Sequence, residues 1–528
     1  MQSDHDHHPH PIAALLKANS FEHPVDDIKL VETHISWVIL TGQFAYKIKK
    51  PVDLGFVDFS SLEKRRFYCE EEVRLNRRLA PDIYLEVVPI TRSPGNSPLM
   101  NRKGNAIEYA VKMMQFPWEA QLDRILDRNE LKPFHLDAFA QIIAIFHKTA
   151  QRAATETAYG DLEHLSQPVY ENFSQIRDNV SDKTLLQTLV TLETRSHEDI
   201  HRLEAVFDQR KADGFIRECH GDLHLRNMAW VRDKPLVFDC IEFNPNLRWI
   251  DVISEIAFLV MDLEKRKQSE LAYRFLNAYL ERSGDYHGLF LLTCYLTYRT
   301  LVRAKVEAIL SGQSHVPPKE QATAYQSFQD YLELAVQYNQ GRPLHLIITH
   351  GLSGSGKTTL TQRLIEQLGA IRIRSDVERK RLFGLKAEDN GRAKIQKDIY
   401  NEDASQRTYS KLVELADHAL EGGYPVIIDA ACLKAEQRAR FQALASIKRI
   451  PYTILEFSFS EATLRHRIKN RTHGASDADL TVLEYQMAAV QKLGPDETHH
   501  AIRVDEERML DISELAKQIE SRRIFVAN

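Results

Sequence analysis

The period of apolar and polar positions changes along this chain of 528 residues. Between about residues 21 and 310, patterns typical of strands come first and helical patterns follow, which predicts an α+β domain. The early elements are three predicted strands at Lys29–His34, Ser36–Leu40 and Gln43–Lys49, and a predicted helix at Ser61–Leu79. From residue 343 onward strand and helix patterns alternate, which predicts an α/β domain with a parallel sheet wrapped by helices.

Four regions follow from this pattern. Residues 1–20 begin with a polar, His-rich segment and are predicted to form a disordered tail. Residues 21–310 form the α+β domain, and residues 343–528 form the α/β domain. Between them, residues 311–342 contain two consecutive prolines and then a helical pattern at Lys319–Tyr338, which indicates a connector with a helical brace.

Composition narrows the class of protein. With 43% hydrophobic and 27% charged residues, the chain is typical of globular proteins, and its net charge of -5 indicates neither a nucleic-acid coat nor a membrane-binding face. No apolar run approaches the roughly 18 residues that a membrane helix needs. The five cysteines are scattered and never in C-x-x-C spacing, which favours a reducing compartment. We therefore predict a cytoplasmic protein without a membrane partner; its oligomeric state stays open.

The stretch Gly351–Thr358 fits the phosphate-binding pattern G-x-x-x-x-G-K-[ST] at every fixed position. It follows a predicted strand at Leu344–Ile348 and precedes a predicted amphipathic helix at Thr359–Ile365, which is the context that the motif requires. Glycines let backbone N–H groups surround a polyphosphate, the lysine reaches its terminal phosphates, and the following hydroxyl can ligate Mg²⁺. The predicted nucleotide contacts are Gly351, Ser353, Gly354, Ser355, Gly356, Lys357, Thr358 and Thr359, with Thr358 also a metal ligand.

Further polar residues follow this loop at positions suited to phosphoryl transfer. Asp376, at the end of a short predicted strand, is the predicted catalytic base, and Arg379 lies one helical turn beyond it. Asp429 ends a second buried strand and is suited to the Mg²⁺ shell. Arg467 and Arg471 lie at i, i+4 on one predicted helix face and could close over the phosphates. The alternatives are a helix cap for Asp376, a strand cap for Asp429 and a solvated helix face for the arginines.

The first large domain carries a second group of residues suited to phosphoryl transfer. His220–Asn227 fits H-x-D-x-x-x-x-N, in which Asp222 can accept the proton of an attacking hydroxyl. Asn227 and Asp239, the latter ending an apolar strand, offer hard oxygen ligands for Mg²⁺. A polar turn before a core strand is the alternative interpretation.

Upstream, Phe44–Lys47 resembles the strand that carries the nucleotide-binding lysine of kinases. Strand alternation places Lys47 and Lys49 on one face, and we favour Lys47 as the phosphate ligand. Glu72, on the inward stripe of the next helix, is the predicted partner that orients this lysine, with Glu71 as the second choice. Val111–Pro117 fits the segment that joins two kinase lobes and would hold an adenine ring.

Together, these motifs resemble the aminoglycoside phosphotransferase family from about residue 25 to 310. The resemblance implies a two-lobed kinase-like domain, ATP between the lobes and a small hydroxylated substrate. One departure is that the loop at Glu32–Ser36 lacks G-x-G-x-x-G. Residues 344–500 resemble the P-loop kinase group that contains gluconate kinase, polynucleotide kinase and zeta-toxin-like enzymes. The whole architecture resembles bacterial proteins described as bifunctional aminoglycoside phosphotransferase/ATP-binding proteins.

The leading hypothesis is therefore a bifunctional phosphotransferase that uses ATP and Mg²⁺ at two separate sites. A regulatory ATP-binding protein is one alternative. A nucleic-acid 5′-hydroxyl kinase is another, because five basic residues cluster in the sequence at Arg372, Arg374, Arg379, Lys380 and Arg381. His197–His201 also satisfies H-E-x-x-H, but charged neighbours indicate a solvent-facing helix in place of a zinc site.

Overall fold

The structure is a computed structural model that describes residues 10–25, 27–55, 57–92, 97–385, 401–470, 480–505 and 511–522. It divides into two compact units, which we describe separately. The first unit comprises Met1–His135, Phe146–His164 and Arg210–Glu255, and the second comprises Leu136–Ile145, Leu165–Gln209 and Ile256–Asn528. Among the helices of the described residues, none combines the length and apolarity needed to cross a membrane.

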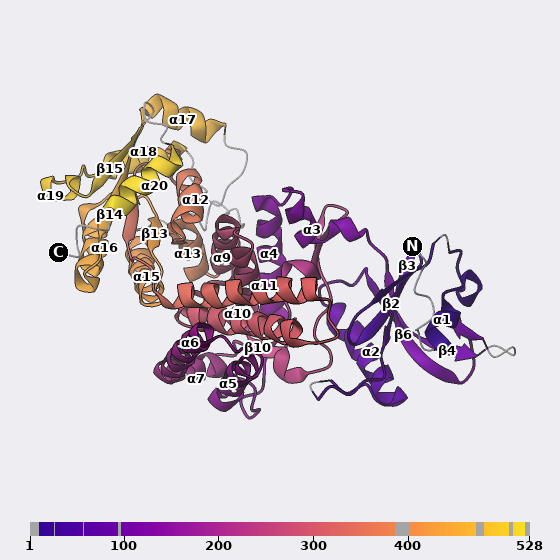
Figure 1. Cartoon of the computed structure of the whole chain (residues 1–528). Coiled ribbons are helices and arrows are strands. Elements are labelled where there is room, and N and C mark those ends of the chain that lie inside the picture. The colour runs from indigo at the N-terminus through magenta and orange to yellow at the C-terminus, as the bar shows by residue number, and fades with distance from the viewer. Residues whose placement is uncertain are drawn as a thin grey trace. The chain divides into compact units, whose positions relative to one another are not determined.

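A six-stranded antiparallel sheet forms the N-terminal part of the first unit, in the order β1-β2-β3-β6-β4-β5 (Figure 1). The three predicted strands are confirmed to within two residues at each end. The strands are β1 (Lys29–Glu32), β2 (Ser36–Leu40), β3 (Phe44–Lys49), β4 (Tyr84–Arg92), β5 (Pro98–Met100) and β6 (Ala106–Met114).

Each face of this sheet is covered by a helix near it in the sequence. Helix α2 (Leu62–Asn76) packs on β4 and β6, with Cys69 and Val73 in one apolar cluster. On the other face lie α1 (His10–Leu15) and the short 3-10 helix η1 (Ala18–Ser20). The structure differs here from the predicted disordered tail, because Ile12 and Leu15 are buried against the apolar side chains of the sheet.

The rest of the first unit holds two pairs of short antiparallel strands. They are β7 (Ile216–Glu218) with β10 (Trp249–Asp251), and β8 (Met228–Val231) with β9 (Lys234–Val237). Short helices flank them: η2 (Trp118–Ala120), α3 (Leu122–Asp127), η3 (Leu225–Asn227) and η4 (Pro245–Leu247). The predicted catalytic loop, His220–Asn227, runs between β7 and β8 and ends in η3.

Helices fill the middle of the chain, and several of them contribute residues to both units. They are α4 (Pro133–Thr149), α5 (Leu162–Arg177), α6 (Lys183–Arg202), α7 (Glu204–Ala212), α8 (Val252–Lys265), α9 (Ser269–Ser283), η5 (Tyr286–Gly288), α10 (Leu289–Gly312) and α11 (Pro318–Asn339). The predicted helical brace corresponds to α11, which packs along α10 in the second unit.

A five-stranded, all-parallel sheet in the order β12-β13-β11-β14-β15 organises the C-terminal part (Figure 1). Helices α12 and α20 share an apolar cluster with one face, and α15 and α16 contact the strands from the other. The strands are β11 (Leu346–His350), β12 (Ile371–Arg374), β13 (Val426–Asp429), β14 (Tyr452–Ser458) and β15 (Ala501–Asp505). The helices are α12 (Lys357–Leu368), α13 (Ser375–Leu382), α15 (Glu402–Glu421), α16 (Ala435–Lys448), α17 (Glu461–Lys469), α18 (Leu480–Ala489), α19 (Pro495–Thr498) and α20 (Ile512–Ser521).

Candidate active sites

Lys47 lies in a cluster of charged groups on the face of the antiparallel sheet that α2 covers. Its Nζ is 2.6 Å from Asp239 Oδ1 and 2.9 Å from Glu72 Oε1. The ladder explains this orientation, because Lys47 pairs with Val111, whose side chain belongs to the apolar cluster beneath α2. The structure therefore brings together three of the residues predicted to bind the nucleotide and its metal.

Both Lys47 and Glu72 are charged at neutral pH. Burial alone would raise the pKa of the Glu72 carboxyl, but the ammonium groups of Lys47 and Lys49 lower that pKa to about 2. Burial likewise opposes the charge on Lys47, but the carboxylates of Asp239 and Glu72 outweigh it and raise the pKa of the lysine. The alternative carboxylate, Glu71, instead accepts from Arg74 at 2.8 Å.

Lys49 is held more deeply than Lys47. Its side chain is 1% exposed, against 14% for Lys47, and its Nζ donates to Glu72 Oε2 at 2.7 Å and to Glu242. Two carboxylates thus enclose Lys49 away from solvent, which favours Lys47 as the lysine that faces a ligand. The sequence prediction missed Glu242, although the signal was an acidic residue three positions after Asp239.

The loop between β7 and β8 is closely hydrogen-bonded around the predicted base. Asn227 Nδ2 donates to the backbone oxygen of Asp222 at 3.0 Å and to its Oδ2 at 2.9 Å. The backbone N–H of Asp222 donates to His220 Nδ1, whose other ring nitrogen lies 2.8 Å from the carbonyl of Phe238. Burial lowers the pKa of His220, so its ring is neutral and fixes the loop without supplying charge.

Glu255, on α8, anchors the start of this loop. Its Oε1 accepts the backbone N–H groups of His220 and Gly221, both at 2.7 Å, and its Oε2 lies 2.7 Å from His147 Nε2. Burial would raise the pKa of this carboxyl, but the hydrogen bond with His147 and the loop N–H groups lower it to about 2. Gly221 has φ +91°, and a Cβ there would lie 2.7 Å from the backbone oxygen of Leu247. Only glycine fits this position without moving the loop.

Two of the predicted metal ligands, Asn227 and Asp239, fit a hard cation chemically. Asn227 directs its Nδ2 to Asp222, so its Oδ1 is not the atom that binds this carboxylate. Asp239 adopts a left-handed conformation, φ +63°, and its N–H donates to the hydroxyl of Tyr84 at 3.1 Å. Amide and carboxylate oxygens are the ligands that Mg²⁺ accepts. The conformation of Asp239 matches the strain often found at functional sites.

The glycine-rich loop connects β11 to α12, which is the strand–loop–helix context predicted from the sequence. Gly356 has φ +87° directly before the helix begins at Lys357. Gly351 approaches β14 so closely that a Cβ would lie 2.7 Å from the Cβ of Phe457. Lys357 donates to the carbonyl oxygens of Gly351 at 2.9 Å and Leu352 at 2.7 Å.

A cavity of about 640 Å³ opens beside this loop, a size suited to a small ligand. It lies at the ends of three strands: β11 leads into the glycine-rich loop, β13 ends at Asp429, and β12 leads into α13. Ligands of parallel sheets are expected at such a position, where the order of the strands changes. The predicted residues that line it are Ser353, Gly354, Ser355, Gly356, Lys357, Thr358, Thr359, Asp376, Arg379, Asp429 and Arg467. Gly351 begins the loop without lining the cavity, and Arg471 lies outside the described residues.

The two predicted carboxylates of this cavity lie at or just after the ends of the neighbouring strands β13 and β12. Asp429 ends β13, and its Oδ2 accepts from Thr361 Oγ1 at 3.3 Å. Asp376 lies in the first turn of α13, because β12 ends two residues earlier. The Thr358 hydroxyl and the Asp429 carboxylate both line the cavity and offer hard oxygen ligands, so their chemistry fits Mg²⁺. The sequence prediction missed Gln486, whose Oε1 accepts from the backbone N–H of Ser353 at 2.8 Å.

The basic cluster near α13 does not form an exposed basic surface. Arg372, Arg379 and Lys380 are each less than 9% exposed. Arg372 and Arg374 both contact Glu281 of α9. A phosphodiester chain needs cations at the surface, so this arrangement removes the main support for a nucleic-acid end kinase.

The H-E-x-x-H segment lies on α6, where His197 stacks on Tyr170 with ring centroids 4.0 Å apart and His201 is exposed. Within the described chain, a buried group of potential metal ligands is instead His147, Cys219 and Glu255. Burial raises the pKa of the Cys219 thiol well above its usual value, and a thiol that keeps its proton is a poor metal ligand. Glu255 already binds His147 and the backbone of the predicted catalytic loop, and these contacts explain why the three side chains lie together.

Two protein families match separate parts of this chain. Residues 118–291 match the phosphotransferase enzyme family, and residues 346–493 match an AAA domain family. Rv2004c of Mycobacterium tuberculosis and Mb2027c of Mycobacterium bovis, both named as uncharacterized proteins, are each 30% identical over 459 residues. That alignment covers 86% of this chain and 89% of each relative. The chain belongs to the family of these mycobacterial proteins. The predicted fold, a kinase-like α+β domain followed by an α/β P-loop domain with a parallel sheet, is confirmed, and the chain is a kinase-type phosphotransferase.

Solved structures show only distant resemblances to this family member. A gluconokinase from Sinorhizobium meliloti 1021 is 19% identical and covers 35% of this chain and 95% of its own, with a TM-score of 0.25. A Plasmodium vivax ethanolamine kinase is 10% identical and covers 59% of this chain and 84% of its own, with a TM-score of 0.37. Likenesses of this degree support no conclusion about substrates.

Proposed function

We propose that this chain is a bifunctional phosphotransferase that moves the γ-phosphoryl group of ATP to hydroxyl groups of two small molecules. The observation that carries this proposal is convergence. Residues chosen from two separate sequence motifs meet in two separate places, one around Lys47 and Asp239 and the other around the cavity beside Lys357. A chance match to either motif would leave its residues scattered.

In the first site, Asp222 is the base that takes the proton of the acceptor hydroxyl. The acceptor oxygen forms a bond to the γ-phosphorus, the bond from that phosphorus to the β–γ bridging oxygen breaks, and ADP leaves. Lys47, held by Glu72, neutralises the phosphates, while Asn227 and Asp239 would hold Mg²⁺. When bound, Mg²⁺ supplies positive charge that offsets the charge of the transferred group.

In the second site, the glycine-rich loop and Lys357 surround the phosphates, and Thr358 with Asp429 would hold Mg²⁺. Asp376, which lines the cavity, is proposed to take the acceptor proton, with the same bonds formed and broken as in the first site. Arg379 lines the cavity beside it, as does Arg467, whose guanidinium lies over the ring of Phe459 at 4.5 Å. Both arginines are proposed to stabilise the charge of the transferred group.

The acceptors are proposed to be small hydroxylated molecules. The cavity volume suits a ligand of that size, and the basic cluster is engaged by protein carboxylates. A regulatory role, in which one domain only senses nucleotide, makes a different prediction: ATP would bind tightly and no phosphorylated alcohol would form.

The test is incubation of the purified protein with γ-labelled ATP and a metabolite extract, followed by separation of the labelled products. Asp222→Asn removes the first base with little change of shape, and Lys357→Ala removes the second phosphate ligand. Matched controls are Asp233→Asn, in the exposed turn between β8 and β9, and Lys517→Ala, on the exposed side of α20. Each control changes the same residue type without touching either site.

We expect two classes of product, one lost in Asp222→Asn and the other lost in Lys357→Ala, with both retained in the controls. Loss of all products in either single variant, with circular dichroism unchanged, would refute two independent sites. Nucleotide binding without any labelled alcohol would favour the regulatory alternative.

A further inference from the structure

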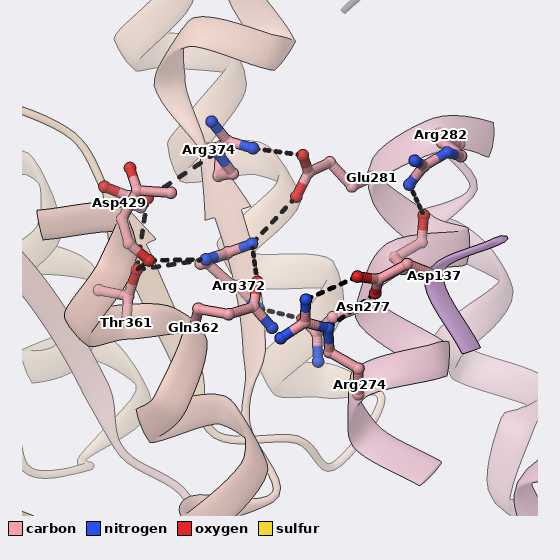
Figure 2. Close-up of polar contacts among 12 residues, drawn as sticks. Asp137, Arg274, Asn277, Glu281, Arg282, Thr361, Gln362, Arg372, Arg374 and Asp429 are labelled. Carbon is pink, nitrogen blue, oxygen red and sulfur yellow. Dashed lines mark hydrogen bonds and ion pairs between the residues drawn. The ribbon is translucent and has the colours of Figure 1, made fainter. Parts of the chain in front are cut away.

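A single carboxylate of α9 lies between two arginines of the parallel sheet. Figure 2 shows Glu281 between the guanidinium groups of Arg374 and Arg372. Glu281 Oε1 accepts from Arg374 Nη1 at 2.5 Å, and Oε2 lies 3.2 Å from Arg372 Nη2. Helix α9 falls within the phosphotransferase family match, whereas both arginines fall within the AAA domain match. All three residues belong to the second unit.

From Glu281, two chains of contacts lead to the residues proposed to hold Mg²⁺. Arg374 is the shorter route, because its Nε is 3.8 Å from Asp429 Oδ2. Arg372 is the longer route: its Nη1 donates to the backbone oxygen of Thr358 at 3.2 Å and to Thr361 Oγ1 at 3.4 Å. Thr361 in turn donates to Asp429 at 3.3 Å (Figure 2). Both routes therefore meet at the cavity wall.

Other contacts hold α9 and η5 against the same strand, so that Glu281 has a fixed position. Asn277 accepts the backbone N–H of Arg372 at 2.7 Å and donates to the backbone oxygen of Ala370 at 2.9 Å. Tyr286, in η5, donates to the backbone oxygen of Arg372 at 3.4 Å. These contacts bond Arg372 of the edge strand β12, and Ala370 just before the strand, to α9 and η5.

We propose that Glu281 is a positioning residue of the second site: it binds Arg374 at 2.5 Å, keeps the contact of Arg374 with Asp429 at 3.8 Å, and so preserves that carboxylate for Mg²⁺. The proposal rests on the proposed function of the cavity as a site for ATP and Mg²⁺. It also means that the second site depends on a helix of the neighbouring phosphotransferase segment.

Charge balance gives the physical reason. Burial would raise the pKa of Glu281, but Arg374 and Arg372 lower it, so the carboxylate is ionised at neutral pH. Without that negative charge, Arg374 still has the carboxylate of Asp429 within 3.8 Å, and a buried guanidinium needs a counter-ion. An Arg374–Asp429 contact closer than the present 3.8 Å would compete directly with a cation at Asp429.

The decisive variant is Glu281→Gln in the full-length protein. Binding of a non-hydrolysable ATP analogue is measured by calorimetry over a range of Mg²⁺ concentrations, and the part of the binding lost in Lys357→Ala defines the second site. The control is Glu270→Gln, an identical change on an exposed residue of the same helix, which contacts Gln367 at 2.7 Å. Amide hydrogen exchange of residues 371–376 without nucleotide gives a readout that needs no ligand.

We expect Glu281→Gln to raise the Mg²⁺ concentration for half-maximal binding by about tenfold or more, since partners of metal ligands have effects of that size. Exchange at residues 371–376 should also become faster, and Glu270→Gln should resemble the wild type. In an Arg374→Gln background the same change at Glu281 should alter the Mg²⁺ requirement by less than about twofold, because the competitor is gone.

Three results would overturn the proposal: an unchanged Mg²⁺ requirement in Glu281→Gln, an equal shift in the Arg374→Gln background, or an equal shift in Glu270→Gln. If Glu281→Gln does not fold, the single variant Arg374→Gln provides the test. A Mg²⁺ requirement of Arg374→Gln above that of the wild type would refute the proposed competition. Absence of Lys357-dependent binding in the wild type would contradict the proposed function of the cavity, while the exchange experiment still tests the position of Glu281.

Discussion

Replacement of Glu72 by glutamine tests the charge cluster of the first site directly. The substitution keeps the shape of the side chain and removes its charge, so Lys47 and Lys49 each lose one of their two carboxylate partners. Glu72 and Lys49 are almost completely buried, and solvent cannot replace the lost partner. We expect a large loss of stability in the first unit.

The pKa of Glu72 gives the magnitude. A carboxyl with a pKa of about 2 in the folded protein and 4.5 in the unfolded chain contributes about 3 kcal/mol above pH 5. Removal of one partner from other buried ion pairs costs about 3–5 kcal/mol, which agrees. Because the folded pKa is the lower one, the native state binds fewer protons than the unfolded chain. The contribution is therefore complete above pH 5 and declines as the pH falls from about 4.5 towards 2.

The assay is urea denaturation followed by tryptophan fluorescence. All four tryptophans, at positions 37, 118, 230 and 249, belong to the first unit, so the signal reports on that unit alone. Glu70→Gln is the matched control, because Glu70 and its partner Arg66 are 52% and 57% exposed and such pairs contribute less than about 1 kcal/mol. Equal losses for Glu70→Gln and Glu72→Gln at pH 7, or a loss for Glu72→Gln that is unchanged at pH 3.5, would refute the reasoning.

Two further substitutions separate the sites. Glu255→Gln should lower the first activity by about tenfold or more and leave the second unchanged, as measured by product assays of both activities. The reason is that one amide cannot replace a carboxylate that accepts from His220, Gly221 and His147. Gly351→Ala should weaken binding of the ATP analogue at the second site by about tenfold or more, because the new Cβ would overlap Phe457. The first activity should be unchanged. Analogue binding as strong as that of the wild type would contradict this prediction and show that the loop can shift without cost.

The sequence alone predicted those features correctly whose signal lies in neighbouring positions of the chain. The strand at Ser36–Leu40 ends at the predicted residues, because alternation and the turn after it are properties of neighbouring positions. The glycine-rich loop is defined by residues within eight positions of one another, and the structure places it between a strand and a helix as expected. Glu72 was found because its spacing to apolar residues on the same helix put it on the buried side.

Contacts between residues that lie far apart along the chain could not be predicted from the sequence. Lys47 and Lys49 could be placed on one face, but nothing local indicates that Glu242 encloses only the second of them. Glu281 gives no signal at all, since a carboxylate near the end of a polar helix is usually solvated. Basic residues near Arg372 suggested a surface for phosphodiesters for the same reason: their burial depends on α9, and sequence spacing does not reveal that contact.

The two sites solve one electrostatic problem in the same way. In the first, two lysines stand at i and i+2 on a strand, so they share a face, and one helical carboxylate bridges them. Glu72 gives Oε1 to Lys47 and Oε2 to Lys49. Lys47 is also 2.6 Å from Asp239, a proposed metal ligand. Glu72 thus shares the ammonium group of Lys47, which would otherwise pair with Asp239 alone.

The second sheet is parallel and unrelated in topology, yet it repeats this arrangement. Glu281 gives Oε1 to Arg374 and Oε2 to Arg372, again at i and i+2, and Arg374 lies near Asp429. A strand that places cations beside a metal ligand needs a second acid to hold them, because an unshared cation would neutralise the ligand. That requirement explains why each site recruits a carboxylate from a helix packed against its strand. It also predicts that loss of either carboxylate raises the Mg²⁺ requirement of its own site and leaves the other unchanged.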